Sequence, residues 1–304
     1  MDIQRVISQL AVLFLLIAAG WVTGKTKILT EDGSKCLSKL VLYVTTPCTI
    51  LSSVFGEDMG VTAAETGLFI LASAAAFLIY FVVAVPSARL LSPNKENRGL
   101  MGFMISFGNV TFMGLPVAIA VFGPASAYYV ALFNIPFMAL VFSVGIIMIS
   151  GKRGKMDLRL LVTPSLIAAL LAVPIALTGY RAPSIPADAI RIAGNLTTPG
   201  SMLVIGSTLS RVKIRDVFSK WRLYPIALLK LTVIPVIAWA VFRPLIASDL
   251  LLGVLVILSG MPTAAMAAMF AIEYGADERF ASSGIFLATL LSGATIPLVV
   301  YFLL

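Results

Sequence analysis

Two stretches of sequence, FGNVTFMGLP at residues 107–116 and SGMPTAAM at residues 259–266, decide the fold of this chain. Each places glycine and proline near the middle of a long apolar run that would otherwise predict an unbroken helix. Proline lacks a backbone donor and clashes with the preceding turn, and glycine lowers the cost of unwinding. Each stretch therefore predicts an interrupted helix, with a simple kink as the alternative for either one taken alone.

The composition places these runs in a membrane. Of 304 residues, 60% are hydrophobic and 12% are charged, and the mean hydropathy is +1.03. A soluble chain carries about 25% charge because its surface faces water. We therefore expect an all-α integral membrane protein, since a backbone in lipid must satisfy its own hydrogen bonds. The net charge of +8 is spread over short loops, as in membrane topology, and does not form a nucleic-acid face.

Ten apolar runs are candidate spans, because about 20 helical residues cross the roughly 30 Å hydrocarbon core. They lie at residues 6–24, 36–55, 65–88, 99–122, 125–150, 158–178, 188–209, 222–243, 250–272 and 280–303. A signal peptide ending near Ala18, Ala19 and Gly20 is the alternative for the first run. Most lysines and arginines fall on the odd-numbered connections. Positive charge marks the cytoplasmic side, so we expect a cell (inner) membrane protein with both termini on the outer side.

The chain also matches itself when it is shifted by half its length. Thr45-Thr46-Pro47 then falls on Thr197-Thr198-Pro199, Gly108 falls on Gly260, and Thr111 falls on Thr263. Each half holds five spans, an odd number, so the second half must be inserted upside down. The sequence predicts two inverted five-helix repeats, residues 1–150 and 151–304, with interrupted spans 4 and 9. Inverted repeats are typical of secondary transporters.

The two interruptions indicate an anion site. Each is expected to leave a half-helix that begins at mid-membrane, near Gly114 and near Thr263, where free N–H groups favour a negative charge. No Asp or Glu lies at the centre of any span, and the chain has no histidine. We therefore expect no metal site, no cofactor and no intramembrane enzyme. Cys36 and Cys48 are interpreted as plain thiols.

Three ordered motifs resemble the auxin efflux carrier family. They are Gly108-Asn109 through Gly114-Leu115-Pro116 with Phe122-Gly123, Asn195 through Ser201 with Gly206 and Leu209, and Met261-Pro262 through Ala271 with Tyr274-Gly275, Ala281-Ser282, Thr289 and Pro297. The resemblance covers nearly the whole chain, and the compact length is similar to that of the prokaryotic members. The ninth-span motif departs from the family pattern, with alanine where an asparagine often follows the proline.

The resemblance implies the ten-span crossover fold shared with bile acid/sodium symporters. It implies a scaffold of spans 1, 2, 6 and 7, a moving unit of spans 3–5 and 8–10, and a homodimer formed through the scaffold. Family substrates are auxin or dicarboxylates such as malonate and malate. The family's substrate contacts correspond here to Asn109 in span 4 and Asn134 in span 5.

The candidate substrate-binding residues are polar or helix-breaking groups within the spans. They are Asn109, Thr111, Pro116, Asn134, Pro262, Thr263, Thr46, Thr198 and Lys230. Each has a structural alternative. The asparagines can pair with backbone or another helix, the threonines with their own helix, and the prolines can merely kink a span. Lys230 can attract an anion or extend back to the cytoplasmic interface.

The function predicted from these features is alternating-access transport of a small organic anion, with efflux driven by the membrane potential. The main alternative is a sodium- or proton-coupled organic anion symporter of the same fold. A non-transporting membrane receptor is a further alternative. A cation–proton antiporter fits less well, because it would need a buried Asp near the interruptions. The expected partners are the organic anion, the bilayer and a second copy of the chain.

Overall fold

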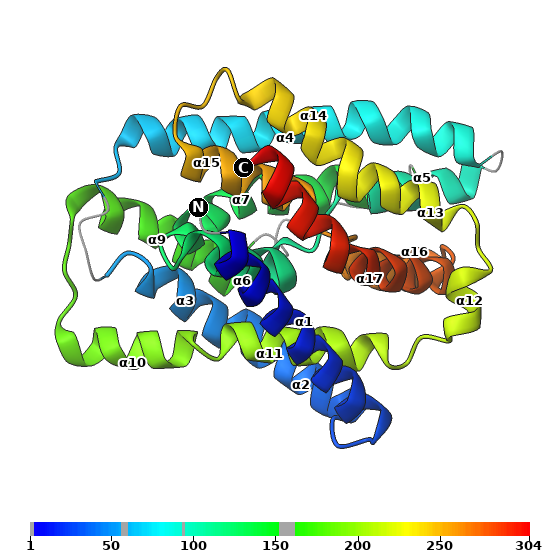
Figure 1. The fold of residues 1–304 in the computed structure, drawn as a ribbon, viewed down its shortest axis with the longest axis horizontal. Helices are drawn as coiled ribbons and strands as arrows, with labels where there is room; N and C mark the ends of the chain where they lie inside the picture. The colour runs from blue at the N-terminus through cyan, green and yellow to red at the C-terminus, as the bar shows by residue number, and fades with distance from the viewer. Residues whose placement is uncertain (1–2, 56–59, 93–94, 152–161) are drawn as a thin grey trace. The chain divides into compact units, whose positions relative to one another are not determined.

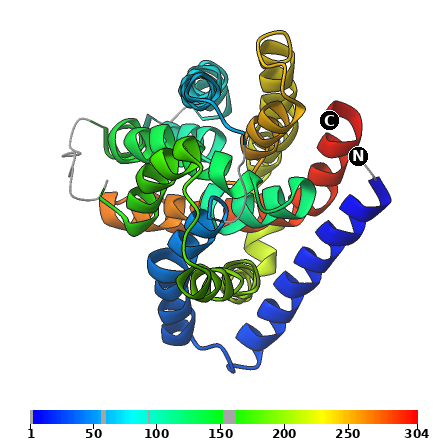
Figure 2. The same cartoon turned by 90° about the vertical axis from the view of Figure 1, so that its left-hand side faces the viewer.

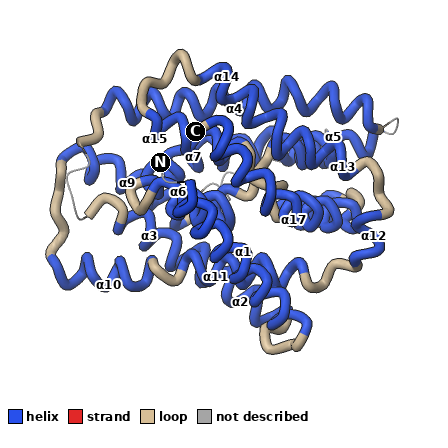
Figure 3. The backbone as a smooth tube through the Cα atoms, viewed as in Figure 1, coloured by secondary structure: helices blue, strands red, loops and turns tan. Residues whose placement is uncertain are grey.

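The computed structural model describes residues 3–55, 60–92, 95–151 and 162–304, and every regular element in these ranges is a helix (Figures 1 and 3). Helices occupy the described part of each predicted run. Five are continuous, and are long and apolar enough to cross a membrane: Gln4–Lys25, Ala63–Leu91, Ser126–Ser150, Leu223–Phe242 and Glu278–Leu303. The all-helical class is confirmed, while the count of ten spans and their inverted repeat stay predictions.

The helices gather into two compact units that do not follow the halves of the sequence. Unit 1 comprises residues 1–71, 111–135 and 162–211, and unit 2 comprises residues 72–110, 136–161 and 212–304. The described parts of scaffold spans 1, 2, 6 and 7 all fall in unit 1, and spans 8–10 fall in unit 2. Spans 3, 4 and 5 are divided between the units. The division into repeats at residues 150 and 151 stays a prediction.

Unit 1 is built around the pairing of its first and its last complete helices. Its complete elements are α1 (Ile3–Lys25), α2 (Glu31–Leu40), η1 (Val41–Thr45), α3 (Thr46–Ser52), α6 (Leu115–Phe122), α9 (Pro164–Thr178), α10 (Ser184–Gly194) and α11 (Thr197–Leu209). Figure 2 shows the loop at residues 26–30 that joins α1 to α2, and Figure 1 shows α10 and α11 following one another along one line. α1 packs along α11, α2 also lies against α11, and α3 lies against α9 and α10.

Glycines allow α1 and α11 to approach at backbone distance. A Cβ atom added at Gly20 would lie 2.5 Å from the Leu203 carbonyl oxygen, and one added at Gly206 would lie 2.0 Å from the Ile17 carbonyl oxygen. Small residues at such crossings let membrane helices pack closely, where dispersion rather than the hydrophobic effect holds them together.

Buried threonines join α3 to α11 at the matching motifs of the two halves. The Thr197 hydroxyl donates to Thr45 Oγ1 at 2.8 Å and lies 2.7 Å from Thr49 Oγ1. The Thr49 hydroxyl also lies 2.9 Å from its acceptor, the Gly194 carbonyl oxygen. Thr45 and Thr197 are the residues that coincide when the chain is shifted by half its length. Their direct hydrogen bond places the two motifs against each other in unit 1.

Unit 2 surrounds the first halves of the two interrupted spans. Its complete elements are α5 (Lys95–Ser106), η3 (Val141–Gly145), α8 (Ile146–Ser150), α12 (Ile214–Phe218), α13 (Leu223–Leu228), η6 (Leu229–Val233), α14 (Ile234–Phe242), α15 (Asp249–Ser259), α16 (Met266–Tyr274) and α17 (Glu278–Leu303). Residues 100–110 and 251–264 are buried without exception. Residues 100–106 of α5 and 251–259 of α15 contain no charged side chain, and an apolar stretch that is buried on all sides belongs inside a protein core.

Three elements run across the division between the units. They are α4 (Ala63–Leu91), η2 (Val110–Gly114) and α7 (Ser126–Leu140).

Prolines account for three π-helical segments. The segments η1, η2 and η6 each end two residues before a proline, at Pro47, Pro116 and Pro235. A proline ring clashes with the carbonyl four residues earlier and offers no N–H to it, so a local widening of the turn relieves the clash. For this reason, the expectation that a half-helix begins near Gly114 is wrong. The helix continues from Val110 to Phe122, and Gly114 has ordinary right-handed helical angles.

We predict that Gly206→Val destabilises the protein, because its side chain would meet the α1 backbone. Overpacking of this kind costs about 1–3 kcal/mol, and the melting temperature in detergent should fall by roughly 2–8 °C. Gly67→Val is the matched control, since Gly67 is also helical and a Cβ atom there meets nothing within 4 Å. Equal melting temperatures for the two variants would contradict the packing of α1 on α11.

Candidate functional site

The two predicted interruptions are confirmed, and they meet in unit 2. α5 ends at Ser106 and helix resumes at Val110, while α15 ends at Ser259 and α16 begins at Met266. Between these ends, Gly108 and Thr263 form an antiparallel β-bridge. The Asn109 N–H donates to the Pro262 carbonyl at 2.7 Å, and the Ala264 N–H donates to the Phe107 carbonyl at 2.9 Å. Each unwound segment thus satisfies backbone groups of the other.

Side chains satisfy further carbonyls at the C-terminal end of α5. The Thr263 hydroxyl donates to the Met104 carbonyl at 3.1 Å, and the Lys230 ammonium donates to the Ser106 carbonyl at 3.4 Å. The last carbonyls of a helix have no intrahelical partner and carry partial negative charge. An ammonium and a hydroxyl therefore act as the cap of this buried helix end.

Four predicted site residues come together at this crossing, and most of their contacts are with the backbone. Asn109 and Pro262 pair through main-chain groups, Thr263 caps α5, and Lys230 is 1% exposed. Because Lys230 donates to a buried carbonyl, it does not extend back to the membrane interface. Asn109 is 8% exposed, and its main-chain bond leaves the side-chain amide for another partner.

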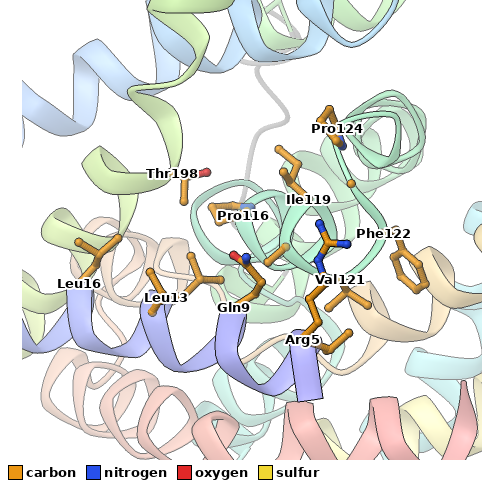
Figure 4. Close-up of a pocket in the computed structure, with 14 residues that line it drawn as sticks. Arg5, Gln9, Leu13, Leu16, Pro116, Ile119, Val121, Phe122, Pro124 and Thr198 are labelled. Atoms are coloured by element: carbon orange, nitrogen blue, oxygen red, sulfur yellow. The ribbon is translucent and has the colours of Figure 1, made fainter. Parts of the chain in front are cut away.

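Two other predicted residues, Pro116 and Thr198, line one pocket in unit 1 (Figure 4). The pocket has a volume of about 550 Å³ and lies between α1, α6 and α11. Its remaining polar side chains are Arg5 and Gln9 of α1, which point from that helix toward α6 in the close-up. The other lining side chains are apolar, and none of the described residues around the pocket is a carboxylate.

The structure does not bring the remaining three predicted residues to this pocket. Thr46 on α3 and Asn134 on α7 are 1% and 6% exposed, and Thr111 lies in η2. Thr46 Oγ1 and Asn134 Oδ1 have no hydrogen-bond partner among the described residues. Buried polar atoms without partners are uncommon in native proteins and mark positions for water or ligand.

Sequence reasoning missed Arg5 and Gln9 as site residues. Arg5 is one of the few basic residues on the predicted outer side of the membrane. Residues four apart share one face of a helix, so a cation and an amide at positions 5 and 9 could have been recognised as a polar stripe entering an apolar span. Nothing in the sequence indicated that α6 lies opposite that stripe.

Comparisons with known proteins identify the family of the chain. A membrane transport protein family matches the chain over residues 5–300. An uncharacterized transporter of Methanocaldococcus jannaschii is 25% identical across 94% of this chain and 95% of its own length. An uncharacterized transporter of Methanothermobacter thermautotrophicus is 25% identical across 93% of this chain and 94% of its own. With its apolar helices, the chain is a multi-pass membrane protein. It belongs to the membrane transport protein family, that of the auxin efflux carriers its motifs resemble.

Proposed function

We propose that the chain is a secondary transporter that moves a small organic anion by alternating access, in the direction of efflux. The substrate class is a mono- or dicarboxylate, such as malonate, malate or an auxin-like acid. The observation that carries this proposal is the pocket between α1, α6 and α11. Its lining contains a guanidinium, an amide and a hydroxyl on otherwise apolar walls, and no carboxylate among the described lining residues.

The chemistry of these groups favours a carboxylate. An arginine fork matches the two carboxylate oxygens, and charge-assisted hydrogen bonds are roughly twice as strong as neutral ones. The amide of Gln9 and the hydroxyl of Thr198 can each donate a further hydrogen bond. The apolar remainder of the pocket suits the hydrocarbon part of an organic acid, as is usual for small-molecule sites.

The crossing in unit 2 supports the same class of substrate. No side chain of the described residues caps the start of α16, and the positive end of its dipole begins three residues after Thr263. Asn109, whose main-chain N–H donates to Pro262, carries a side-chain amide that can donate a further hydrogen bond. In secondary transporters, half-helix N-termini at such breaks commonly face an anionic substrate group.

The membrane potential can supply the driving force for export. One charge is worth about 2.3 kcal/mol per 100 mV, so a dianion would gain about 4.6 kcal/mol, a ratio of roughly two thousand. We place the protein in the cell membrane with both termini outside, on the basis of its lysine and arginine distribution. We further propose a homodimer formed through spans 1, 2, 6 and 7.

We predict that Asn109→Ala lowers transport at least tenfold in proteoliposomes supplied with labelled malonate, malate or indole-3-acetate. A hydrogen bond to a charged group contributes about 1.5–3 kcal/mol, and about 1.4 kcal/mol corresponds to a factor of ten. Asn195→Ala is the control, since Asn195 is exposed at the end of α10. Binding of an acid without any flux, with or without sodium, would indicate a receptor instead.

We predict that Arg5→Gln raises the KM for the transported acid about 5- to 20-fold, and that this effect shrinks in high salt because the side chain is solvent-exposed. Arg191→Gln makes the same charge change on the same predicted side of the membrane. Arg191 is exposed and paired with Asp188, outside the pocket, and its loss should leave the KM unchanged. If both variants raise the KM equally, the pocket is not the site at which the acid is recognised.

A further inference from the structure

Lys230 is a fully buried cation without an acidic partner. It lies in η6, within the continuous helical segment Leu223–Phe242, and is 1% exposed. None of the ion pairs among the described residues includes it. An isolated charge in an apolar interior costs several kcal/mol or more unless other groups compensate it. The compensation must therefore come from dipoles around its ammonium.

Three contacts define the position of this ammonium. Its Nζ donates to the Ser106 carbonyl at 3.4 Å and lies 5.1 Å from the centroid of the Tyr80 ring. Its Cε would be 3.3 Å from a Cβ atom at Gly108, so the side chain passes directly beside the interruption of span 4. Lys230 lies within the π-helical turn that precedes Pro235. Such turns are frequent at functional sites.

The end of α5 and the face of the Tyr80 ring supply the negative potential around the ammonium. Ser106 is the last residue of α5, so its carbonyl lies at the negative end of that helix dipole. Ser259 is the last residue of α15, and its hydroxyl shares a hydrogen bond with the Tyr80 hydroxyl. The Tyr80 ring, whose face is also negative, thus connects the ammonium to the second half-helix end. Ser106 Oγ is buried and has no hydrogen-bond partner among the described residues, so the residue that accepts from the ammonium also carries an oxygen without a partner.

In secondary transporters, half-helix C-terminal ends and unwound carbonyls hold the coupling sodium ion. We propose that the Lys230 ammonium is the resident cation of the crossing and occupies the place that a sodium ion would take. Lys230 is then a positioning residue. It neutralises the end of α5, holds Ser106 beside Gly108, and makes the crossing independent of sodium. The sodium independence of transport rests on the proposed function, whereas the assignment of the Lys230 ammonium to the cation site does not.

Sodium-dependent thermal stability tests the cation site without any substrate. We would measure melting temperatures of the full-length protein in detergent, in sodium chloride and in choline chloride at equal ionic strength. The wild type should show no saturable difference between the salts. Lys230→Asn removes the ammonium and adds an oxygen ligand beside Ser106, so sodium should raise its melting temperature by about 2–4 °C in a saturable manner. Lys213→Asn, at an exposed lysine of the same unit, should behave as the wild type.

Saturable stabilisation of the wild type by sodium would overturn the proposal, because the site would then be open to the ion. A folded Lys230→Asn variant that ignores sodium would overturn it as well. Lys230→Met preserves much of the side-chain length but offers neither charge nor an oxygen, so its melting temperature should not respond to sodium. A sodium response in this variant would show that the ion binds elsewhere.

Flux measurements extend the test to transport. Replacing sodium with choline should change wild-type flux less than twofold. The flux of Lys230→Asn should fall more than tenfold in choline and recover in part in sodium. The wild type could transport none of the acids while sodium raises the melting temperature of Lys230→Asn alone. That result would contradict the proposed substrate class but would still support the cation site. Sodium-dependent flux in the wild type would overturn the inference.

Discussion

The main-chain pairing of residues 107–109 with residues 262–264 is the constraint on which the rest of unit 2 depends. A backbone group without a partner in hydrocarbon costs several kcal/mol, so an interrupted helix is tolerated only where other protein groups replace its lost bonds. Here each interruption supplies the donor and the acceptor that the other needs. Neither unwound segment would be stable alone, which explains why both are completely buried and why α5 and α15 form the centre of the unit.

This pairing also decides the electrostatics of the crossing. The C-termini of α5 and α15 lie in one buried region that contains an ammonium and no ion pair among its described residues, and α16 begins next to this region. Lys230 and the Thr263 hydroxyl cap the negative end of α5, while no side chain of the described residues caps the positive end of α16. The imbalance favours a negative ligand. The pocket of unit 1, with its guanidinium and its apolar walls, has the same preference.

The sequence predicted the elements of the fold better than it predicted the roles of individual residues. Hydropathy located the helices, and glycine with proline located both interruptions, because each of these signals is local. The start of the second half of span 4 was misplaced at Gly114, since a π-helical turn absorbs Pro116 without breaking the helix. The capping by Thr263 and Lys230, and the entry of Arg5 and Gln9 into a pocket with Pro116, depend on packing between distant segments. Periodicity and composition carry no information about such contacts.

We propose that the protein carries net negative charge together with an organic acid, without a coupling sodium ion. The most direct test is the current recorded from proteoliposomes on a solid-supported membrane when the acid is added in sodium-free buffer at constant pH. The account predicts a transient current that corresponds to negative charge moving with the acid and that is unchanged when sodium is supplied. Uptake of labelled acid without any current, or a current that requires sodium, would contradict it.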